Sequence, residues 1–301
     1  MLYYITAVIA CLSFAFVPIV AQSLFKYFDE YSITYAIIAV KALPFIFLAL
    51  FGSSGVDLWS AFSWKSVMIS SIEVVRTLVL RLCYLLLPPS IAQALYFTFP
   101  FMVSFLNVVL GNIDLSMELL FGALISLFGS LVFILSGRNA LSQVPKIKFG
   151  YSIIVGIMLV LSGAFLQALE TVFIKNGNRM CMDNFEDLKE KDKKILDIVP
   201  KMYNLYTFAF LLTTGIFVLM YYMGYIRRFD INLNSLPLLM VSFVATIGYF
   251  FSNQGLSREV IGFYPYLIVV LTGVLSPNED FGLWRVFASC LILLGAYIAN
   301  K

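Results

Sequence analysis

A hydrophobic segment that occurs twice constrains the fold of this chain more than any other feature. Residues 13–26 read SFAFVPIVAQSLFK and residues 162–175 read SGAFLQALETVFIK, with Ser, Ala, Phe and Lys at equivalent positions. Internal similarity of this kind indicates a repeated structural unit. We therefore expect two copies of one fold within the chain.

A second, shorter internal similarity supports the duplication. Pro100 stands between two phenylalanines and is followed fourteen residues later by Asp114, and Pro265 stands between two tyrosines and is followed at the same distance by Glu279. The distance in sequence between the two copies is larger for the second similarity than for the first, and a charged insertion near residues 176–201 accounts for the difference.

The composition predicts that lipid is the solvent of this chain. Of its 301 residues, 61% are hydrophobic and only 12% are charged, whereas soluble proteins have about 25% charged residues. The mean hydropathy is +0.93, so one aqueous globule cannot bury the apolar surface. The net charge of +3 is small and scattered, which argues against nucleic acid as a partner.

Ten stretches of the chain are suited to cross a bilayer, since a membrane-spanning helix needs about 20 mostly apolar residues. They are 3–24, 33–52, 67–88, 90–111, 117–137, 151–174, 203–223, 237–257, 260–276 and 283–300. We predict an all-α membrane protein with ten transmembrane helices.

The ten spans divide five and five at the basic stretch 138–149. This division predicts a first repeat at 1–137 and a second at 150–301, with the charged insertion near 176–201 inside the second. An odd number of spans per half forces the halves to insert in opposite senses, which is the inverted repeat of secondary transporters. The distribution of Lys and Arg favours cytoplasmic N- and C-termini, and the excess comes from the insertion.

Three segments resemble a known family. They are SIAQALYFTFPFMVSFLNVVLGNID (90–114), FGALISLFGSLVFILSG (121–137) and PNEDFGLWRVFASCLILLGAYIA (277–299). They resemble the fourth, fifth and last helices of EamA-like members of the drug/metabolite transporter superfamily. Pro100 lies at the family proline, and Glu279 matches the acidic residue that precedes the last helix.

The resemblance extends over nearly the whole chain. Lys41 stands where the family often has an arginine, Arg76 matches a family arginine, and Gly122 and Gly129 match family glycines. Asp114 departs from the family, which usually has glutamate there. The resemblance implies a ten-helix secondary transporter of a small organic solute and does not name that solute.

Charges inside the expected spans are the first candidates for a solute site, because a charge at the bilayer centre costs about 2.5–3.5 kcal/mol on insertion scales. Lys41 lies midway along the second span, where it could contact an anionic solute or a coupling carboxylate. A structural ion pair and a snorkelled amine are the alternatives.

Three more charged candidates lie in the third span. Glu73 and Arg76 are three residues apart, so we expect a local pair on one helix face. Arg81 lies about 80° round the helix from Glu73, which favours a position facing a cavity. Arg76 is expected near the cytoplasmic end of its span, where anchoring to lipid headgroups is the alternative.

Polar residues of four other spans complete the expected site. Glu170, which shares a helix face with Gln167, is a candidate coupling carboxylate that exchanges a proton, the alternative being an ion pair with Lys175 or Lys41. The uncharged candidates for the lining are Gln93, Tyr96, Asn253, Gln254 and Tyr264. Their alternative roles are to satisfy helix backbones or to join the interfacial aromatic belt.

The chain contains no histidine and no GxxxxGK[ST], HExxH or GxSxG motif. We therefore expect no metal, no cofactor and no enzyme activity, and transport driven by a gradient of solute, proton or another ion. Cys11, Cys83 and Cys290 lie in apolar spans and are expected to be buried thiols.

Small residues mark two close-packing faces, one with Gly122 and Ser126 and the other with Gly295 and Ala299. They fit either a homodimer or packing within one monomer.

The sequence thus predicts a secondary transporter that moves a small metabolite, anionic or zwitterionic, by alternating access. We expect it in a bacterial inner membrane or in a eukaryotic cell or organelle membrane. A scaffold or receptor-like protein that keeps the fold without transport, and a channel, are the alternative classes.

Overall fold

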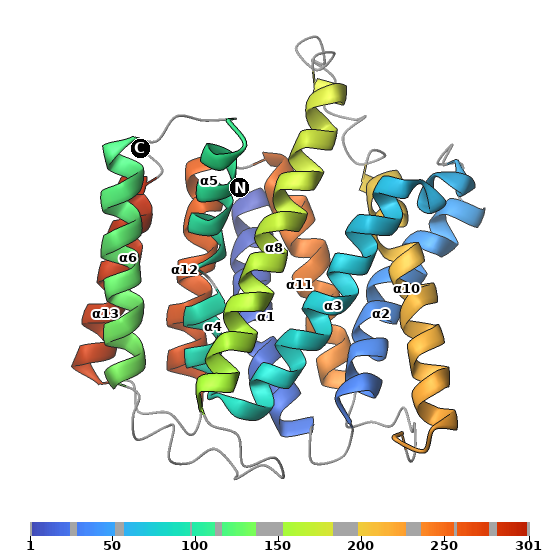
Figure 1. The fold of residues 1–301 in the computed structure, drawn as a ribbon, viewed down its shortest axis with the longest axis horizontal. Coiled ribbons are helices and arrows are strands. Elements are labelled where there is room, and N and C mark those ends of the chain that lie inside the picture. Colours follow the sequence, from blue (N-terminus) through green and yellow to red (C-terminus); the bar gives the residue numbers. More distant parts are fainter. Residues whose placement is uncertain are drawn as a thin grey trace.

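The computed structural model describes residues 2–24, 29–51, 57–96, 98–111, 116–136, 153–182, 198–226, 236–255, 258–276 and 282–299. These residues form helices almost throughout, and no strand occurs among them. The elements are α1 (Leu2–Leu24), α2 (Glu30–Phe51), the 3-10 helix η1 (Leu58–Phe62), α3 (Trp64–Leu86), α4 (Pro89–Tyr96), α5 (Phe99–Val109), α6 (Met117–Ser136), α8 (Ile153–Met182), α10 (Ile198–Tyr222), α11 (Leu236–Gly255), α12 (Arg258–Leu275) and α13 (Leu283–Ala299) (Figure 1).

Apolar runs account for the long helices, and each of the ten predicted ranges contains helix. Within the described ranges, six helices are long and apolar enough to cross a membrane. They are Ala7–Leu24, Glu30–Phe51, Pro89–Val109, Met117–Ser136, Ile153–Val172 and Met202–Tyr222. The chain is therefore a helical protein with membrane-type helices, while ten crossings stay a prediction.

Two predicted ranges differ in detail from the helices observed. The range 90–111 contains two helices, α4 and α5, with a break between Tyr96 and Phe99. Pro100 lies in the first turn of α5, where its missing N–H has no intrahelical partner to lose. The helix α8 extends past the predicted end at 174 as far as Met182, so the middle of that helix is further along the chain than the sequence indicated.

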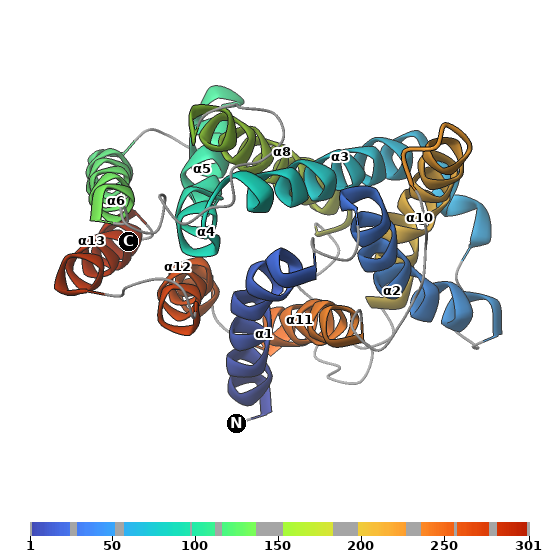
Figure 2. The ribbon, with the colours of Figure 1, turned by 90° about the horizontal axis from the view of Figure 1, so that it is seen from below.

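The long helices stand side by side, and the most extensive packing joins a helix that precedes residue 137 to one that follows residue 152. These pairs are α6 with α13, α1 with α11, α3 with α8, and α2 with α10. Seen from below, α6 and α13 stand at one end of the molecule, and α2 and α10 stand at the other (Figure 2). Ala10, Ala15 and Ala21 of α1 are fully buried, and such small side chains let neighbouring helices approach closely.

The pairing of α6 with α13 uses the small residues that the sequence singled out. A Cβ added to Gly122 would lie 2.5 Å from the backbone of Gly295, and one added to Gly295 would lie 2.5 Å from the Gly122 carbonyl oxygen. The hydroxyl of Ser126 donates a hydrogen bond to the Ile292 carbonyl at 3.0 Å. The two small-residue faces therefore pack against each other within one monomer.

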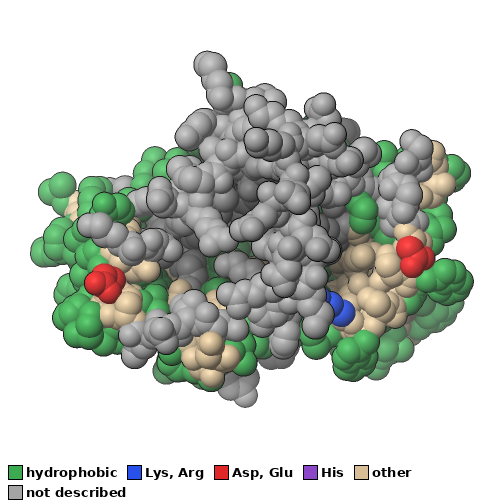
Figure 3. All heavy atoms as spheres, turned by 90° about the horizontal axis from the view of Figure 1, so that it is seen from above, with side chains coloured by type: hydrophobic (Ala, Val, Ile, Leu, Met, Phe, Trp, Pro, Cys, Tyr) green, Lys and Arg blue, Asp and Glu red, His purple; other side chains and the backbone are tan. Residues whose placement is uncertain are grey.

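The outer flanks of the molecule are apolar. Hydrophobic side chains cover both flanks in the space-filling view (Figure 3). On α6 the exposed side chains include Leu124, Leu127, Phe128, Leu131 and Leu135, while Ser126 and Ser130 of the same helix are buried. An apolar exterior with a partly polar interior is the arrangement that a lipid environment favours.

The cysteines were predicted to be buried thiols, and for one of them this is wrong. Cys11 and Cys83 are buried, but Cys290 is exposed. The reason is its position on α13, on the side opposite Ile292, which packs against Gly129 of α6. An apolar span that lies at the edge of a bundle exposes one face even though its composition is uniformly hydrophobic.

Candidate functional site

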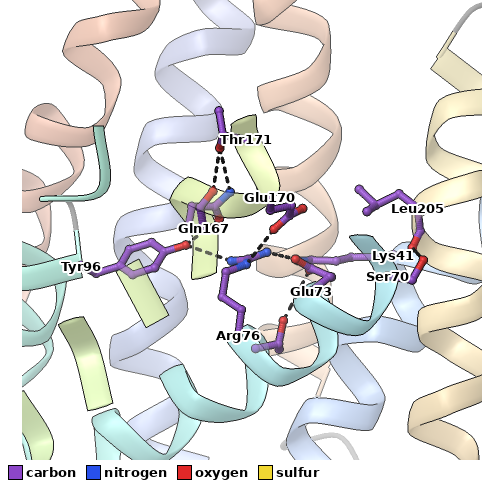
Figure 4. Close-up of polar contacts among 10 residues, drawn as sticks. Lys41, Ser70, Glu73, Arg76, Tyr96, Gln167, Glu170, Thr171 and Leu205 are labelled. Atoms are coloured by element: carbon purple, nitrogen blue, oxygen red, sulfur yellow. Dashed lines mark hydrogen bonds and ion pairs between the residues drawn. The ribbon is translucent and has the colours of Figure 1, made fainter. Parts of the chain in front are cut away.

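Five charged side chains from three helices lie near one another, with α3 packed against both α2 and α8. They are Lys41 of α2, Glu73, Arg76 and Arg81 of α3, and Glu170 of α8. We call these residues the buried charge cluster, and Figure 4 shows four of them in contact. In the part of the chain that is described, no group of three or more Cys, Asp and Glu side chains is arranged to hold a metal ion.

Glu73 is the most deeply buried member of the cluster, with no exposed surface. Its Oε1 atom lies 3.3 Å from Lys41 Nζ and accepts a hydrogen bond from the Thr77 hydroxyl at 3.4 Å. Its Oε2 atom pairs with Arg76, one turn along the same helix. The predicted local pair between Glu73 and Arg76 is therefore confirmed, and Lys41 is the second cation on the same carboxylate.

Arg76 joins three helices through its guanidinium group. Its Nε atom lies 3.1 Å from Glu170 Oε2 on α8, and its Nη1 atom donates to the Tyr96 hydroxyl on α4 at 2.9 Å. The Tyr96 hydroxyl in turn donates to Gln167 Oε1 at 2.7 Å, and Gln167 Nε2 donates to the Thr171 hydroxyl at 3.4 Å. Arg76 thus anchors a polar chain that runs from α3 through α4 to α8.

Two predictions about position are corrected by these contacts. Arg76 was expected near the cytoplasmic end of its span, but α3 extends from Trp64 to Leu86 and places Arg76 midway along it. The span predicted at 151–174 placed Glu170 near a helix end, with an ion pair to Lys175 or Lys41 as the alternative to a coupling role, yet Glu170 lies inside α8 and pairs with Arg76. The side chain of Lys175 lies outside the described residues. Lipid anchoring of Arg76 is wrong because its charge is matched inside the protein.

Lys41 contacts a second partner that sequence reasoning missed. Its Nζ atom lies 5.5 Å from the centre of the Tyr206 ring on α10, within the range of a cation–π contact. Tyr206 is buried. The only signal for it in the sequence is a tyrosine within an apolar span, and such residues are common enough that this one did not stand out.

Arg81 differs from the other charged members. It is 6% exposed, and its Nε and Nη1 atoms have no hydrogen-bond partner among the described residues. Its guanidinium lies over the ring of Tyr84, 5.3 Å from the ring centre. The charge interacts unfavourably with Arg76 and with Lys41. Neither described carboxylate of the cluster forms an ion pair with it.

Gln93 lies on α4, and its contacts favour a role between helices. Its Nε2 atom donates to the Phe14 carbonyl of α1 at 3.5 Å, while its Oε1 atom is buried without a hydrogen-bond partner in the described structure. Asn253 and Gln254 lie on α11 and Tyr264 lies on α12. The side chains of these last three candidates lie outside the described residues.

The charges of the cluster do not balance. Two carboxylates face three cations, so the cluster carries an excess positive charge when all five groups are ionised. Desolvating an ion costs several kcal/mol, and a buried pair offsets that cost only with good geometry and further hydrogen bonds. Glu73 has two cationic partners and a hydrogen bond from Thr77, and Glu170 has Arg76, whereas Arg81 has no carboxylate partner among the described residues.

Comparisons with known proteins bear on the fold and not on the function. No protein-family model matches the chain, and no curated protein matches it. Seventeen chains of solved structures match it. One of them, described only as the crystal structure of a protein, is 16% identical to this chain with a TM-score of 0.61, over 99% of this chain and 96% of that one. The two proteins thus share their fold over nearly their full lengths.

Proposed function

We propose that this protein is a secondary transporter that moves a small organic solute across a membrane by alternating access. The observation that carries the proposal is the buried charge cluster. Lys41 and Glu170 of the cluster belong to helices that are long and apolar enough to cross a membrane. The cluster also joins the two predicted repeats, because Arg76 of the first pairs with Glu170 of the second. Charged groups inside spanning segments mark substrate or ion pathways, and secondary transporters bind their cargo at a repeat interface near the midplane.

The packing of the helices supports ten crossings arranged as two inverted halves. If α4 and α5 count as one crossing, α8, α10, α11, α12 and α13 are the counterparts of α1, α2, α3, α4 with α5, and α6. The packing of α1 on α11 then corresponds to that of α8 on α3, and the pairs α2 with α10 and α6 with α13 each join counterparts. Figure 1 further shows α1 and α8 running in opposite senses.

The mechanism follows from where the ion pairs lie. When one half tilts against the other, the contact of Arg76 with Glu170 and that of Lys41 with the Tyr206 ring must stretch or re-form, since each joins the two predicted halves. The pair of Lys41 with Glu73 lies within the first half and moves with it. A solute group or a proton that replaces a broken contact would lower the cost of the motion, which couples solute binding to exchange between states.

Membership of the drug/metabolite transporter superfamily is part of the proposal, as are cytoplasmic chain termini and the absence of enzyme activity. The EamA-like pattern of residues and the repeat-related packing support it. A scaffold that keeps this fold would tolerate the loss of the buried charges, whereas a channel would conduct without saturation.

Counterflow in proteoliposomes tests the proposal. A thermal-shift screen of the purified chain against a panel of metabolites identifies a solute, because a ligand that binds the folded state raises its apparent stability. Vesicles loaded with that solute should then accumulate labelled solute transiently, with saturable kinetics. Glu170→Gln should abolish the accumulation, and Glu118→Gln, which changes an exposed carboxylate of α6, should leave it intact. Unsaturable conductance would contradict the carrier in favour of a channel.

The orientation of the halves needs its own experiment. Single cysteines placed in the segments 25–28 and 183–197, in a variant that lacks the native cysteines, should be labelled from opposite faces of the membrane by a membrane-impermeant maleimide. The same face for both would contradict the inverted arrangement, because those segments follow α1 and α8, which are counterparts in the two halves.

A further inference from the structure

Arg81 carries the charge that the buried charge cluster leaves unmatched. Glu73 holds Lys41 and Arg76, and Glu170 holds Arg76. With both carboxylates of the cluster engaged by other cations, no described anion compensates the Arg81 guanidinium. The group is nevertheless 6% exposed, so water does not solvate it as it would a surface arginine.

The contact of Arg81 with the Tyr84 ring does not use the hydrogen-bond donors of its guanidinium group. The Tyr84 ring, 5.3 Å from the guanidinium carbon, contacts one face of the group, but the N–H donors of a guanidinium lie in its plane. The Nε and Nη1 donors have no partner in the described part of the structure. Leaving donors of a buried charged group unsatisfied is unfavourable, and repulsion from Arg76 and Lys41 adds to that cost.

We propose that Arg81 binds an oxyanion, a carboxylate or a phosphate group, of the transported solute. This inference rests on the proposed function and narrows the cargo to organic anions. The planar guanidinium suits carboxylate and phosphate oxygens because it offers several donors in fixed geometry. One bound negative charge would also cancel the excess positive charge of the cluster.

The same reasoning assigns a different role to Lys41, which the sequence presented as the best candidate for contact with the solute. Lys41 is already paired with Glu73 at 3.3 Å and lies over the Tyr206 ring. It therefore positions the carboxylate that holds Arg76, and the free donors needed for an anion belong to Arg81.

Thermal unfolding of the full chain in a non-ionic detergent tests the proposal, with sodium phosphate and sodium acetate as probes and sodium chloride at equal ionic strength as the reference. Phosphate or acetate should raise the melting temperature of the natural protein by mass action. Arg81→Met should abolish that rise. Without an anion, Arg81→Met should melt at a higher temperature than the natural protein, because an uncompensated buried charge has been removed.

Arg285→Met is the matched control. Arg285 is 1% exposed and its guanidinium carbon lies 5.2 Å from the centre of the Phe133 ring, so it is likewise a buried arginine over an aromatic ring, but it lies between α6 and α13. Its replacement should leave the anion response intact. Arg81→Lys, which keeps the charge with fewer donors, should show a reduced response and serves if the Arg285 variant does not fold.

Three results would overturn the assignment. The first is a natural protein whose melting temperature responds to neither anion. The second is a response that Arg81→Met retains in full. The third concerns the headgroup of an anionic phospholipid, which offers the same chemistry. If nanodiscs with phosphatidylglycerol stabilise the natural protein over phosphatidylcholine alone, if Arg81→Met removes that difference, and if soluble anions have no effect, the site binds lipid and not cargo.

Counterflow separates the failure of this inference from the failure of the proposed function. Solute counterflow that persists at full rate in Arg81→Met contradicts the anion site and leaves transport standing. Anion binding that depends on Arg81, in a protein that shows no counterflow of any stabilising anion, contradicts transport and leaves an anion site in a protein of another class.

Discussion

The junction between α6 and α13 and the junction of α2, α3 and α8 hold the molecule together in opposite ways. The first is built from Gly122, Gly295 and small neighbours whose backbones nearly touch. The second is built from long charged side chains that reach across from separate helices. Both junctions join the two predicted repeats. The difference between them therefore indicates different freedom to rearrange.

A junction of small residues depends on shape and has few alternatives, because any added atom meets backbone. A junction of ion pairs can exchange partners, since a cation released by one carboxylate can be taken by another carboxylate or by a ligand. The comparison therefore indicates a fixed edge at α6 and α13 and an adjustable centre at the buried charge cluster. That division suits a carrier whose halves move about a central site.

Breaking the fixed edge should have the largest effect. Gly122→Leu places a side chain where even a Cβ would lie 2.5 Å from the opposing backbone, and we expect a loss of more than about 5 kcal/mol, at the extreme of single substitutions. The fraction of protein that elutes as a monodisperse peak in size-exclusion chromatography reports the loss of folded protein. Gly215→Leu is the control, because a Cβ at Gly215 meets nothing within 4 Å. Equal behaviour of the two variants would mean that α6 and α13 are not tightly packed.

Removing the central carboxylate should have the next largest effect. Glu73→Gln leaves Lys41 and Arg76 without their shared partner, and breaking a buried pair in this way costs about 3–5 kcal/mol. The midpoint of thermal or denaturant unfolding in detergent measures the loss. Adding Lys41→Met to Glu73→Gln should restore part of it, since one uncompensated charge then disappears. If the double variant is no more stable than Glu73→Gln alone, Lys41 is not held by that carboxylate.

Removing a single hydroxyl group from the polar chain should have the smallest effect on stability. Tyr96→Phe keeps the ring but removes the oxygen that accepts from Arg76 and donates to Gln167, so we expect a loss of about 1–3 kcal/mol. Tyr222→Phe is the control, because Tyr222 is 83% exposed and should change stability by less than about 0.5 kcal/mol. The same unfolding midpoints serve, and equal shifts would remove the Tyr96 hydroxyl from the polar chain.

Sequence reasoning succeeded where the physics is local. Apolar runs of about 20 residues identified where helices form, and a spacing of three residues identified the pair of Glu73 with Arg76. It also singled out Gly122 and Gly295 as close-packing positions, and left open whether their partner lay in the same chain. The apolar runs, the ion pair and the small-residue positions could be predicted because each depends on residues that are close together in the sequence.

Sequence reasoning failed where a contact depends on which helix faces meet. Glu170 pairs with Arg76, 94 residues away, and neither helix pattern predicts that partner. The same holds for Tyr206 over Lys41, and for Cys290, whose exposure follows from the position of α13 at the edge of the bundle. A uniformly apolar helix carries little pattern to show which side faces its neighbours.

The amino-acid sequence by itself determined that this chain folds into apolar helices and that a few ionic side chains lie within them. Only the tertiary structure decided which charges of the buried charge cluster form ion pairs with one another, and that Arg81 is the member without a described carboxylate partner. The reason is that burial of a charge is a property of one segment, whereas its compensation is a property of the several helices that surround it.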